Sequence, residues 1–446
     1  MLIQFTVSNF LSFKDEQTFS MVANTGEKDT ELLDNVFRSV DDRMSLLRSS
    51  VVYGANASGK SNFVKALSFY LGFILASTQS IEQQAIATRP YKLETHYSEK
   101  STKLEAVLEV GDCIYRYGYE LTHSEVLREW LYVIEAKKQR KREKLIFERT
   151  RAELAAKDSG WKKLMVVTKK NSLLLTVAAQ FNLTTAKKIV NYIAAKIMVV
   201  SDVQALFSST TEYLYAIQEN GTNLGIIDDV CKLLQAADIA IDGFKIISRD
   251  IKKNELPEHV PAAFANFLSA LPSESYNFKQ VVTTHKQYDS DGKIAGMVNF
   301  DMASEESIGT VKLFSMSIPL LMLLRNGGTL IIDELESSLH PLLVRYITGL
   351  FNSSLTNPHN AQLIFTTHYD GILNNGMFRR DQIWFAEKGD RGATELYSLL
   401  EFRQNKTAVR KDASYDRDYL AGRYGAIPLV SENYLTELHS QVEKYG

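Results

Sequence analysis

The chain opens with alternating apolar and polar residues, a pattern that predicts a pair of strands. Apolar residues occupy every second position of residues 3–7, and the pattern resumes at Phe19 and Met21 after a turn at residues 8–13. A period of two residues is typical of strands that bury one face. Residues 24–48 are polar and mixed, which predicts a loop with a short helix.

The same alternation returns from Tyr91 to about Phe147 and predicts further strands. Residues 130–147 resemble a hairpin whose tip carries the basic run Lys137–Arg142. A basic run of this kind can contact a phosphate backbone. More often it is a solvated turn that blunts an exposed sheet edge, and we favour that second interpretation.

The pattern changes to helical spacing between residues 150 and 275. Apolar positions recur at intervals of three and four in residues 183–197 and 224–240, with few glycines and no chemical motif. We therefore predict a helical insertion, too short and too poorly patterned in heptads to form a long coiled-coil arm. Strand patterns resume at residues 244–248 and 280–285.

Residues 50–61 carry the most specific motif of the chain. An apolar run at 50–53 predicts a strand, and Gly54-Ala-Asn-Ala-Ser-Gly-Lys-Ser61 then matches G-x-x-x-x-G-K-[ST] at every fixed position. Apolar positions between residues 63 and 74 predict the helix that such a loop requires. The alternative is a glycine-rich turn with an incidental Lys-Ser pair, which this flanking pattern disfavours.

The spacing of this motif fits a nucleoside triphosphate. Gly54 and Gly59 allow a tight turn in which backbone N–H groups point at phosphate oxygens, and the helix start adds its positive dipole end. Lys60 would reach the β- and γ-phosphates, and the Ser61 hydroxyl would ligate Mg²⁺. The predicted ATP-binding residues of the loop are Gly54, Asn56, Ala57, Ser58, Gly59, Lys60, Ser61 and Asn62.

A second motif ends an apolar run far along the chain. Residues 329–332 predict a buried strand, and Asp333 and Glu334 follow it directly. Asp333 could hold Mg²⁺, directly or through water, while Glu334 could polarise the water that attacks the γ-phosphate. An apolar run before two acids is common, but it gains weight downstream of a phosphate loop.

Two further segments are candidates for the same site. The apolar strand at 362–367 ends in His368, which could contact the γ-phosphate; the alternative is a helix cap or a core imidazole. Ser307 would cap a helix whose apolar face follows, and with Gly309 it would leave N–H groups open to an anion. A capped helix without a ligand explains the same pattern.

Composition limits the class of protein but does not identify it. The 446 residues are 45% hydrophobic and 23% charged, with a net charge of −2, so any nucleic-acid surface must be local. The two cysteines, Cys113 and Cys231, argue against a disulfide framework or a cysteine zinc site. No signal peptide pattern or apolar run of membrane-spanning length is present, so we expect a cytoplasmic protein and no membrane.

Together these residues resemble the ATP-binding-cassette (ABC) ATPases of the SMC, RecF and OLD type. Within that group the chain most resembles the compact AAA-annotated ATPases of bacterial anti-phage abortive-infection operons, which are RloA- and PtuA-like. The resemblance covers about residues 1–125 and 280–430. The matching segments are the first strands at 3–13, Walker A at 54–61, Walker B at 330–334, the D-loop at 338–341, the switch histidine at 366–368 and a closing segment at 417–428.

The resemblance implies an α/β fold, a P-loop ATPase head of the ABC/SMC type built from both chain ends. An N-terminal antiparallel β subdomain and an inserted helical subdomain complete it. We expect an N-terminal lobe at 1–149, the insertion at 150–279, with possible oligomer or partner contacts, and a C-terminal lobe at 280–446.

The resemblance also implies a homodimer of heads, or a higher homo-oligomer, with ATP between Walker A of one head and the signature of the other. Ser307 and Gly309 fall at two positions of the Leu-Ser-Gly-Gly signature, while Glu306 and Ile308 replace its other residues. Only these two positions of the signature therefore carry over to this chain. The candidates for the Q-loop glutamine are Gln79, Gln83 and Gln84.

Three functions fit these observations. The first is an Mg²⁺-dependent ATPase that acts as the switch or sensor of an abortive-infection system, with a separately encoded effector that the resemblance implies is a nuclease. The second is a RecF- or SMC-like protein that binds duplex DNA directly, which the absence of a long arm and of net basic charge disfavours. The third is a scaffold that keeps ATP as a structural ligand, which an intact Glu334 and His368 disfavour.

Overall fold

The computed structural model describes residues 1–27, 32–79, 84–138, 141–222, 225–237, 240–252, 275–373, 376–404, 407–410, 413–421 and 423–426. The chain divides into two compact units. Unit 1 comprises Met1–Val199, Gly327–Leu335 and Ile347–Gly446, and unit 2 comprises Val200–Asn326 and Glu336–Tyr346. Unit 1 is thus built from segments that lie far apart in the sequence.

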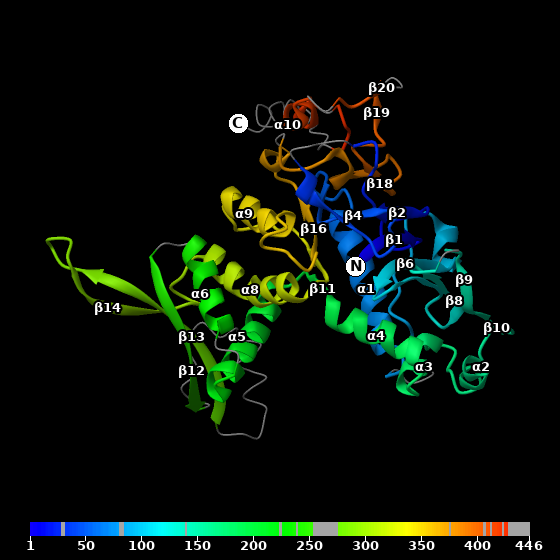
Figure 1. Cartoon of the computed structure of the whole chain (residues 1–446), viewed down its shortest axis with the longest axis horizontal. Helices are drawn as coiled ribbons and strands as arrows, with labels where there is room; N and C mark the ends of the chain where they lie inside the picture. Colours follow the sequence, from blue (N-terminus) through cyan, green and yellow to red (C-terminus); the bar gives the residue numbers. More distant parts are fainter. Residues whose placement is uncertain are drawn as a thin grey trace, which may run out of the picture. The chain divides into compact units, whose positions relative to one another are not determined.

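A six-stranded sheet forms the centre of unit 1 (Figure 1). Strands β15, β16, β5 and β17 run parallel in that spatial order, and β18 pairs antiparallel with β17. The parallel strands are short apolar runs buried along most of their length, as expected for strands covered on both faces. In the order β11-β15-β16-β5-β17-β18, the strands are Ile197–Val200, Thr329–Ile332, Gln362–Thr367, Ser49–Tyr53, Ile383–Lys388 and Thr394–Ser398.

A seven-stranded antiparallel sheet forms the second layer of unit 1. Buried and half-buried residues alternate strictly along β6, which confirms the period of two predicted for this part of the chain. The predicted strand pair at the N-terminus is also confirmed, because β1 and β2 pair antiparallel around the turn at residues 8–13. In the order β10-β9-β8-β7-β6-β1-β2, the strands are Leu154–Ala156, Lys144–Thr150, Val126–Glu135, Cys113–Leu121, Thr102–Val110, Leu2–Ser8 and Gln17–Ser20.

Helix α1, Lys60–Ala76, contacts strands of both sheets. Its buried side chains join one hydrophobic core with residues of each sheet. The ring of Tyr70 lies 5.7 Å from that of Phe5 on β1, and the ring of Phe19 on β2 lies 5.0 Å from that of Trp384 on β17. This packing fixes the first turn of α1 at the carboxyl end of β5.

Shorter elements complete unit 1. Residues 24–48 contain the predicted short helix, a 3₁₀ turn at Leu33–Asn35, but also a hairpin of β3 and β4 that the polar composition did not predict. Their bounds and those of the remaining elements are β3 Val36–Arg38, β4 Ser45–Leu47, η2 Thr95–Glu99, α2 Ser159–Met165, α3 Leu174–Gln180, α4 Thr184–Lys196, η3 Asp370–Ile372, η4 Arg380–Gln382, β19 Arg403–Gln404, β20 Thr407–Ala408 and α10 Tyr415–Leu420.

The basic run at the tip of the β8–β9 hairpin is neutralised by acids of the same unit. The Nζ of Lys137 lies 2.9 Å from a carboxylate oxygen of Asp112, and that of Lys141 lies 3.0 Å from Asp41. Residues 139 and 140 of the run lie outside the described residues. These ion pairs support a structural turn rather than a phosphate-binding surface.

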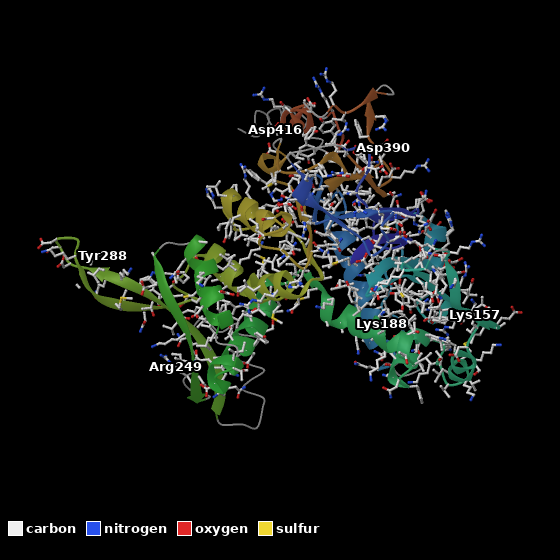
Figure 2. All side chains as sticks on the ribbon, in the orientation of Figure 1. Lys157, Lys188, Arg249, Tyr288, Asp390 and Asp416 are labelled. Atoms are coloured by element: carbon white, nitrogen blue, oxygen red, sulfur yellow. The ribbon has the colours of Figure 1, made fainter. Side chains whose placement is uncertain are left out.

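Unit 2 combines helices with a three-stranded antiparallel sheet of order β12-β13-β14. Tyr288, Ile294 and Met297 are exposed on the β13–β14 hairpin, with Tyr288 at the end of β13 (Figure 2). Of the helix predicted at 224–240, residues 224, 238 and 239 lie outside the described residues. The elements are α5 Val203–Asn220, α6 Gly225–Ala237, β12 Ile241–Lys252, β13 Ser275–Tyr288, β14 Ile294–Asp301, α8 Ile308–Asn326 and α9 Pro341–Asn352, which continues into unit 1.

Helix α8 is apolar on nearly every side and forms the core of unit 2. By length and composition it could span a membrane, but 67% of that window is buried in the structure, as expected of a core helix. Pro319 lies inside it and provides no N–H for the carbonyl of Ser315. The hydroxyl of Thr210 on α5 donates to that carbonyl at 2.7 Å, so the acceptor is satisfied from the neighbouring helix.

Units 1 and 2 divide the chain at other positions than the three predicted domains do. The predicted domain bounds stay a prediction. Residues 150–199 belong to unit 1, and 200–279 belong to unit 2 together with 280–326. The middle of the chain holds helices α2 to α6, and it also holds the strands β10, β11 and β12. Short runs rich in β-branched residues, such as 197–200, form these strands within an otherwise helical pattern.

Candidate nucleotide site

The loop between β5 and α1 has the close approaches that explain its two glycines. A Cβ atom at Gly59 would lie 2.2 Å from the Oγ1 of Thr394, and Gly59 has a φ of +113°. A Cβ atom at Gly54 would lie 2.4 Å from the carbonyl oxygen of Ala386. Only glycine fits both positions, because any side chain would displace a neighbouring strand.

The buried ammonium of Lys60 holds this loop together. Its Nζ donates to the carbonyl oxygen of Gly54 at 2.5 Å and to that of Ala55 at 2.9 Å. A buried charge requires partners of this kind, since leaving water is costly. The loop therefore curls around a cation at the amino end of α1, an arrangement suited to an anion.

The two predicted halves of the site meet at the carboxyl ends of the parallel strands. The Oγ of Ser61 lies 3.2 Å from the Oδ1 of Asp333, which follows β15. Thr366 at the end of β16 donates to the same Oδ1 at 2.7 Å, and its hydroxyl accepts the backbone N–H of Glu334 at 2.8 Å. Glu334 is exposed and has a φ of +49°. This threonine thus ties both acids to the strand between β15 and β5.

The donor set at this point fits a magnesium ion. Mg²⁺ prefers oxygen ligands, keeps several waters and takes one or two protein oxygens beside those of phosphates. The hydroxyl of Ser61 and the carboxylate of Asp333 are such ligands, and they lie within hydrogen-bonding distance of each other. Within the described ranges no cluster of three or more His, Cys, Asp or Glu side chains forms a closed metal site.

The remaining predicted residues of this unit lie around the same edge. Asn56 and Ala57 are exposed on the loop, while Ser58 is buried. The amide of Asn62 donates to the Oγ of Ser12 at 2.8 Å. His368 follows β16 directly and is exposed.

Sequence reasoning missed the hydroxyl residues that support the loop. Thr394 on β18 donates to the carbonyl of Ser58 at 2.7 Å, and it also lies 2.7 Å from the Oγ of Ser12. Ser12 lies in the segment 3–13 that carries the resemblance, but nothing there indicates a contact with the loop, and Thr394 belongs to no motif. Thr366 was part of the switch segment, but its contact with Asp333 has no sequence signal.

The signature-like segment lies in unit 2. The Oγ of Ser307 accepts the N–H of Thr310 at 3.1 Å, so Ser307 caps α8 as predicted. A Cβ atom at Gly309 would lie 2.6 Å from the carbonyl oxygen of Ser338, which explains the glycine. The segment predicted as the D-loop therefore lies against the start of α8.

Glu306, which replaces the signature leucine, binds the sheet of unit 2. Its carboxylate accepts from the hydroxyl of Thr283 and lies 2.7 Å from the Nε2 of His285, both on β13. Ile308, which replaces a glycine, is 74% exposed. Glu306, directly before the capping serine, thus binds β13, whereas Ile308, directly after it, faces solvent.

Two of the Q-loop candidates, Gln79 and Gln84, follow the far end of α1 in the chain. Gln79 and Gln84 are exposed, and Gln83 lies outside the described residues. Helix α1 has 17 residues, which at 1.5 Å per residue makes it about 25 Å long. Because the phosphate loop lies at the other end of this helix, the structure does not bring Gln79 to the site.

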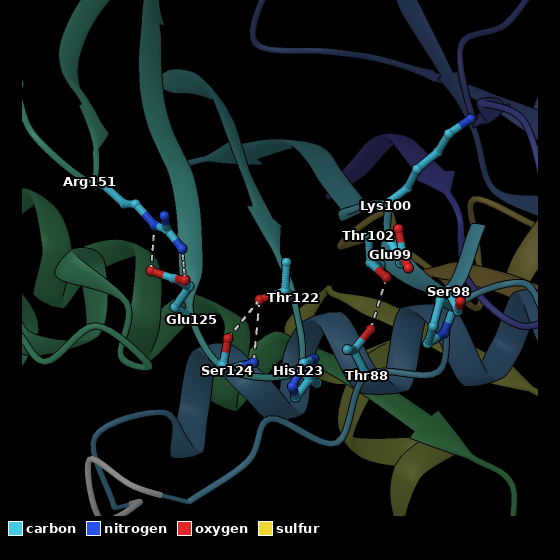
Figure 3. A pocket seen from close by; sticks show the side chains of 11 residues that line it. Thr88, Ser98, Glu99, Lys100, Thr102, Thr122, His123, Ser124, Glu125 and Arg151 are labelled. Carbon is cyan, nitrogen blue, oxygen red and sulfur yellow. Dashed lines mark hydrogen bonds and ion pairs between the residues drawn. The ribbon is translucent and has the colours of Figure 1, made fainter. Parts of the chain in front are cut away.

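A separate cleft of about 390 Å³ lies in unit 1 (Figure 3). Hydroxyl and charged side chains line it, among them Thr88 and Thr102, whose Oγ1 atoms lie 2.8 Å apart. Arg151 and Glu125, which also line it, form an ion pair. None of its lining residues belongs to the predicted nucleotide site.

The order of the parallel strands, the glycine loop between β5 and α1, and the two acids after β15 together define a P-loop nucleoside triphosphatase. The AAA_21 family, described as "AAA domain, putative AbiEii toxin, Type IV TA system", matches residues 49–162 and 242–374. This match covers more than half of the chain, so the chain belongs to that family of AAA ATPases. It confirms the predicted fold class and the resemblance to abortive-infection ATPases.

Solved structures with similar folds include two SMC heads and RecF. An SMC head bound to the C-winged helix domain of ScpA is 13% identical, with a TM-score of 0.44 over 89% of this chain and 97% of that chain. The SMC head of Thermotoga maritima is 10% identical, with a TM-score of 0.38 over 89% of this chain and 98% of that chain. The recombination mediator RecF with ATPrS is 12% identical, with a TM-score of 0.35 over 89% of this chain and 98% of that chain. No curated protein matches the chain.

Proposed function

We propose that this protein binds and hydrolyses Mg²⁺-ATP and is the nucleotide-driven switch of an abortive-infection defence system in the cytoplasm. The observation that carries the proposal is the contact between Ser61 and Asp333 beside the buried Lys60. These groups come from two distant segments, yet they meet where a metal-bound triphosphate requires them. The family description, a putative toxin of a type IV system, supports the defence role.

Each residue has a separate proposed role. Lys60 and the N–H groups at the start of α1 bind phosphate oxygens, while Ser61 and Asp333 hold the metal. When bound, Mg²⁺ supplies positive charge that offsets the charge developing on the phosphates. Glu334 orients and polarises the attacking water, and His368, at the end of the neighbouring strand, senses the γ-phosphate.

We also propose that a second copy of the chain completes the site. Ser307 and Gly309 would bind the nucleotide of the partner head through the start of α8. Ile308, Leu342 and Tyr346 of unit 2 are exposed large apolar residues on segments near that start or near the D-loop. Such residues favour burial against another protein. A separately encoded effector, which we propose to be a nuclease, would respond to the closed and open states.

The test compares the wild type with Lys60→Ala and Glu334→Gln. Titration calorimetry with Mg²⁺-ATP should show that Lys60→Ala abolishes binding, because the loop loses the cation that contacts Gly54 and Ala55. Glu334→Gln should bind ATP but release phosphate about a hundredfold more slowly, the usual cost of a lost general base. Light scattering should then show an ATP-dependent dimer in this slow variant.

Lys65→Ala is the matched control, because Lys65 is exposed on the same helix. It should behave as wild type in all three assays. A wild-type protein that neither binds ATP nor releases phosphate, with or without its effector, would refute the proposal. ATP-stimulated, salt-sensitive binding of plain duplex DNA by the protein alone would instead favour a RecF-like role.

A further inference from the structure

The C-terminal part of unit 1 returns to the first turn of the phosphate loop. The backbone N–H of Ala55 donates to the carbonyl oxygen of Ala426 at 2.8 Å. The carbonyl of the same residue, Ala55, accepts from the Nζ of Lys60 at 2.9 Å. Both polar groups of this alanine are therefore bound, one by the phosphate-binding lysine and the other by the end of the described chain.

The backbone around Ala426 is shaped to present that carbonyl. Gly425 and Ala426 have φ values of +68° and +55°, a left-handed conformation that alanine rarely adopts. A Cβ atom at Gly425 would lie 2.5 Å from the Oε1 of Glu387 on β17, the end of a flexible side chain, so the positive φ is the main reason for glycine at this position. The hydroxyl of Tyr419 donates to the Ala426 carbonyl at 3.0 Å and fixes its direction.

Aromatic packing holds this segment against β5 and β17. Tyr419 and Tyr424 are 5% and 2% exposed, and both rings lie 5.7 Å from that of Phe385. The ring of Tyr419 also lies 6.0 Å from that of Tyr53, the last residue before the phosphate loop. Burial raises the pKa of Tyr419 to about 12, so the hydroxyl retains the proton that it donates.

We infer that residues 415–421 and 423–426, the C-terminal strap, position the first turn of the phosphate loop for the nucleotide. Tyr419 is the positioning residue, and it acts through the carbonyl of Ala426. With the strap in place, the Ala55 peptide is fixed from both sides, and the lysine bound to it is preorganised. This inference rests on the proposed function, because it assigns the strap a role in nucleotide affinity.

The experiment compares Tyr419→Phe with Tyr424→Phe in the full chain. Both changes remove one buried hydroxyl from the same aromatic cluster, but Tyr424 donates to Asp418 inside the strap and not to Ala426. Hydrogen exchange without nucleotide reports on the peptide that contains Ala55, and calorimetry gives the Kd for Mg²⁺-ATP. Thermal unfolding without ligand measures the structural cost of each change.

Tyr419→Phe should raise exchange at the phosphate loop and weaken ATP binding roughly threefold to tenfold, the worth of one net hydrogen bond. Tyr424→Phe should leave both readouts at the wild-type value, even if its melting temperature falls equally. Unchanged exchange at the loop in Tyr419→Phe, or equal loss of affinity in both variants, would overturn the inference. A wild-type chain with a protected loop and no ATP binding would refute the proposed function itself, and the strap's nucleotide role with it.

Discussion

The hydroxyl of Thr366 is the group whose removal tests the geometry of the two acids. It donates to the Oδ1 of Asp333 and accepts the N–H of Glu334. Thr366→Val keeps the shape of the buried side chain and removes both interactions. The left-handed backbone of Glu334 would then lose the hydrogen bond that holds it.

The size of the effect follows from these two bonds. A hydrogen bond to a carboxylate contributes about 1.5–3 kcal/mol and a neutral one about 0.5–1.5 kcal/mol. Asp333 is half-buried, so water replaces part of the first interaction. We therefore expect a loss of about 1–3 kcal/mol in the free energy of unfolding.

Turnover should fall more than substrate affinity, because Asp333, the proposed metal ligand, and Glu334, the residue proposed to polarise the water, both lose their contact with this hydroxyl. At about 1.4 kcal/mol for each factor of ten, loss of this positioning predicts a decrease of roughly tenfold to a hundredfold in kcat. Phosphate release under saturating ATP measures kcat, and urea denaturation measures stability. The variant should still bind ATP, since the phosphate loop is untouched.

Thr367→Val is the control, because the buried Thr367 is adjacent on β16 and its hydroxyl accepts only the N–H of Tyr369, at 3.0 Å, among the contacts described. It should cost similar stability and leave kcat near the wild-type value. If Thr366→Val kept full turnover, or if both variants lost turnover equally, the assigned link between this hydroxyl and the acids would be wrong.

Two further predictions concern unit 2. Thr210→Val should lower the free energy of unfolding by about 1–3 kcal/mol in urea denaturation, because the carbonyl of Ser315 loses its donor, whereas Thr210→Ser should stay near wild type. Gly309→Ala should cost about 1–3 kcal/mol, since its Cβ would lie 2.6 Å from the carbonyl oxygen of Ser338. Gly349→Ala has open space around its Cβ in α9 and should not destabilise the protein; equal losses for both glycines would contradict the steric argument.

The parts of the site that could be predicted are local in sequence. The strand, glycine loop and helix of residues 50–74 follow one another, so their periodicity and spacing define them without tertiary information. The same holds for Asp333, because an apolar run of four buried residues before it indicates a central parallel strand. Once both strands lie in one sheet, their carboxyl ends meet at one edge.

The supporting contacts could not be predicted, because single hydroxyl residues carry no pattern. Ser12, Thr394 and Thr366 reach the site from three separate strands or loops, and threonine is common in any strand. The β3–β4 hairpin was missed for a related reason. Its strands have three residues each, too short for a period of two to show in a mixed polar segment.

The two departures from the signature motif, Glu306 and Ile308, have a physical explanation that only the structure provides. Ser307 must cap α8 and Gly309 must admit the carbonyl of Ser338, and these are the two positions that agree with the motif. Glu306 instead binds β13, and Ile308 points to solvent, so neither position is constrained by the helix start itself. The segment therefore keeps the serine cap and the close approach of Ser338 that the helix start needs, while its other two residues contact β13 and face solvent.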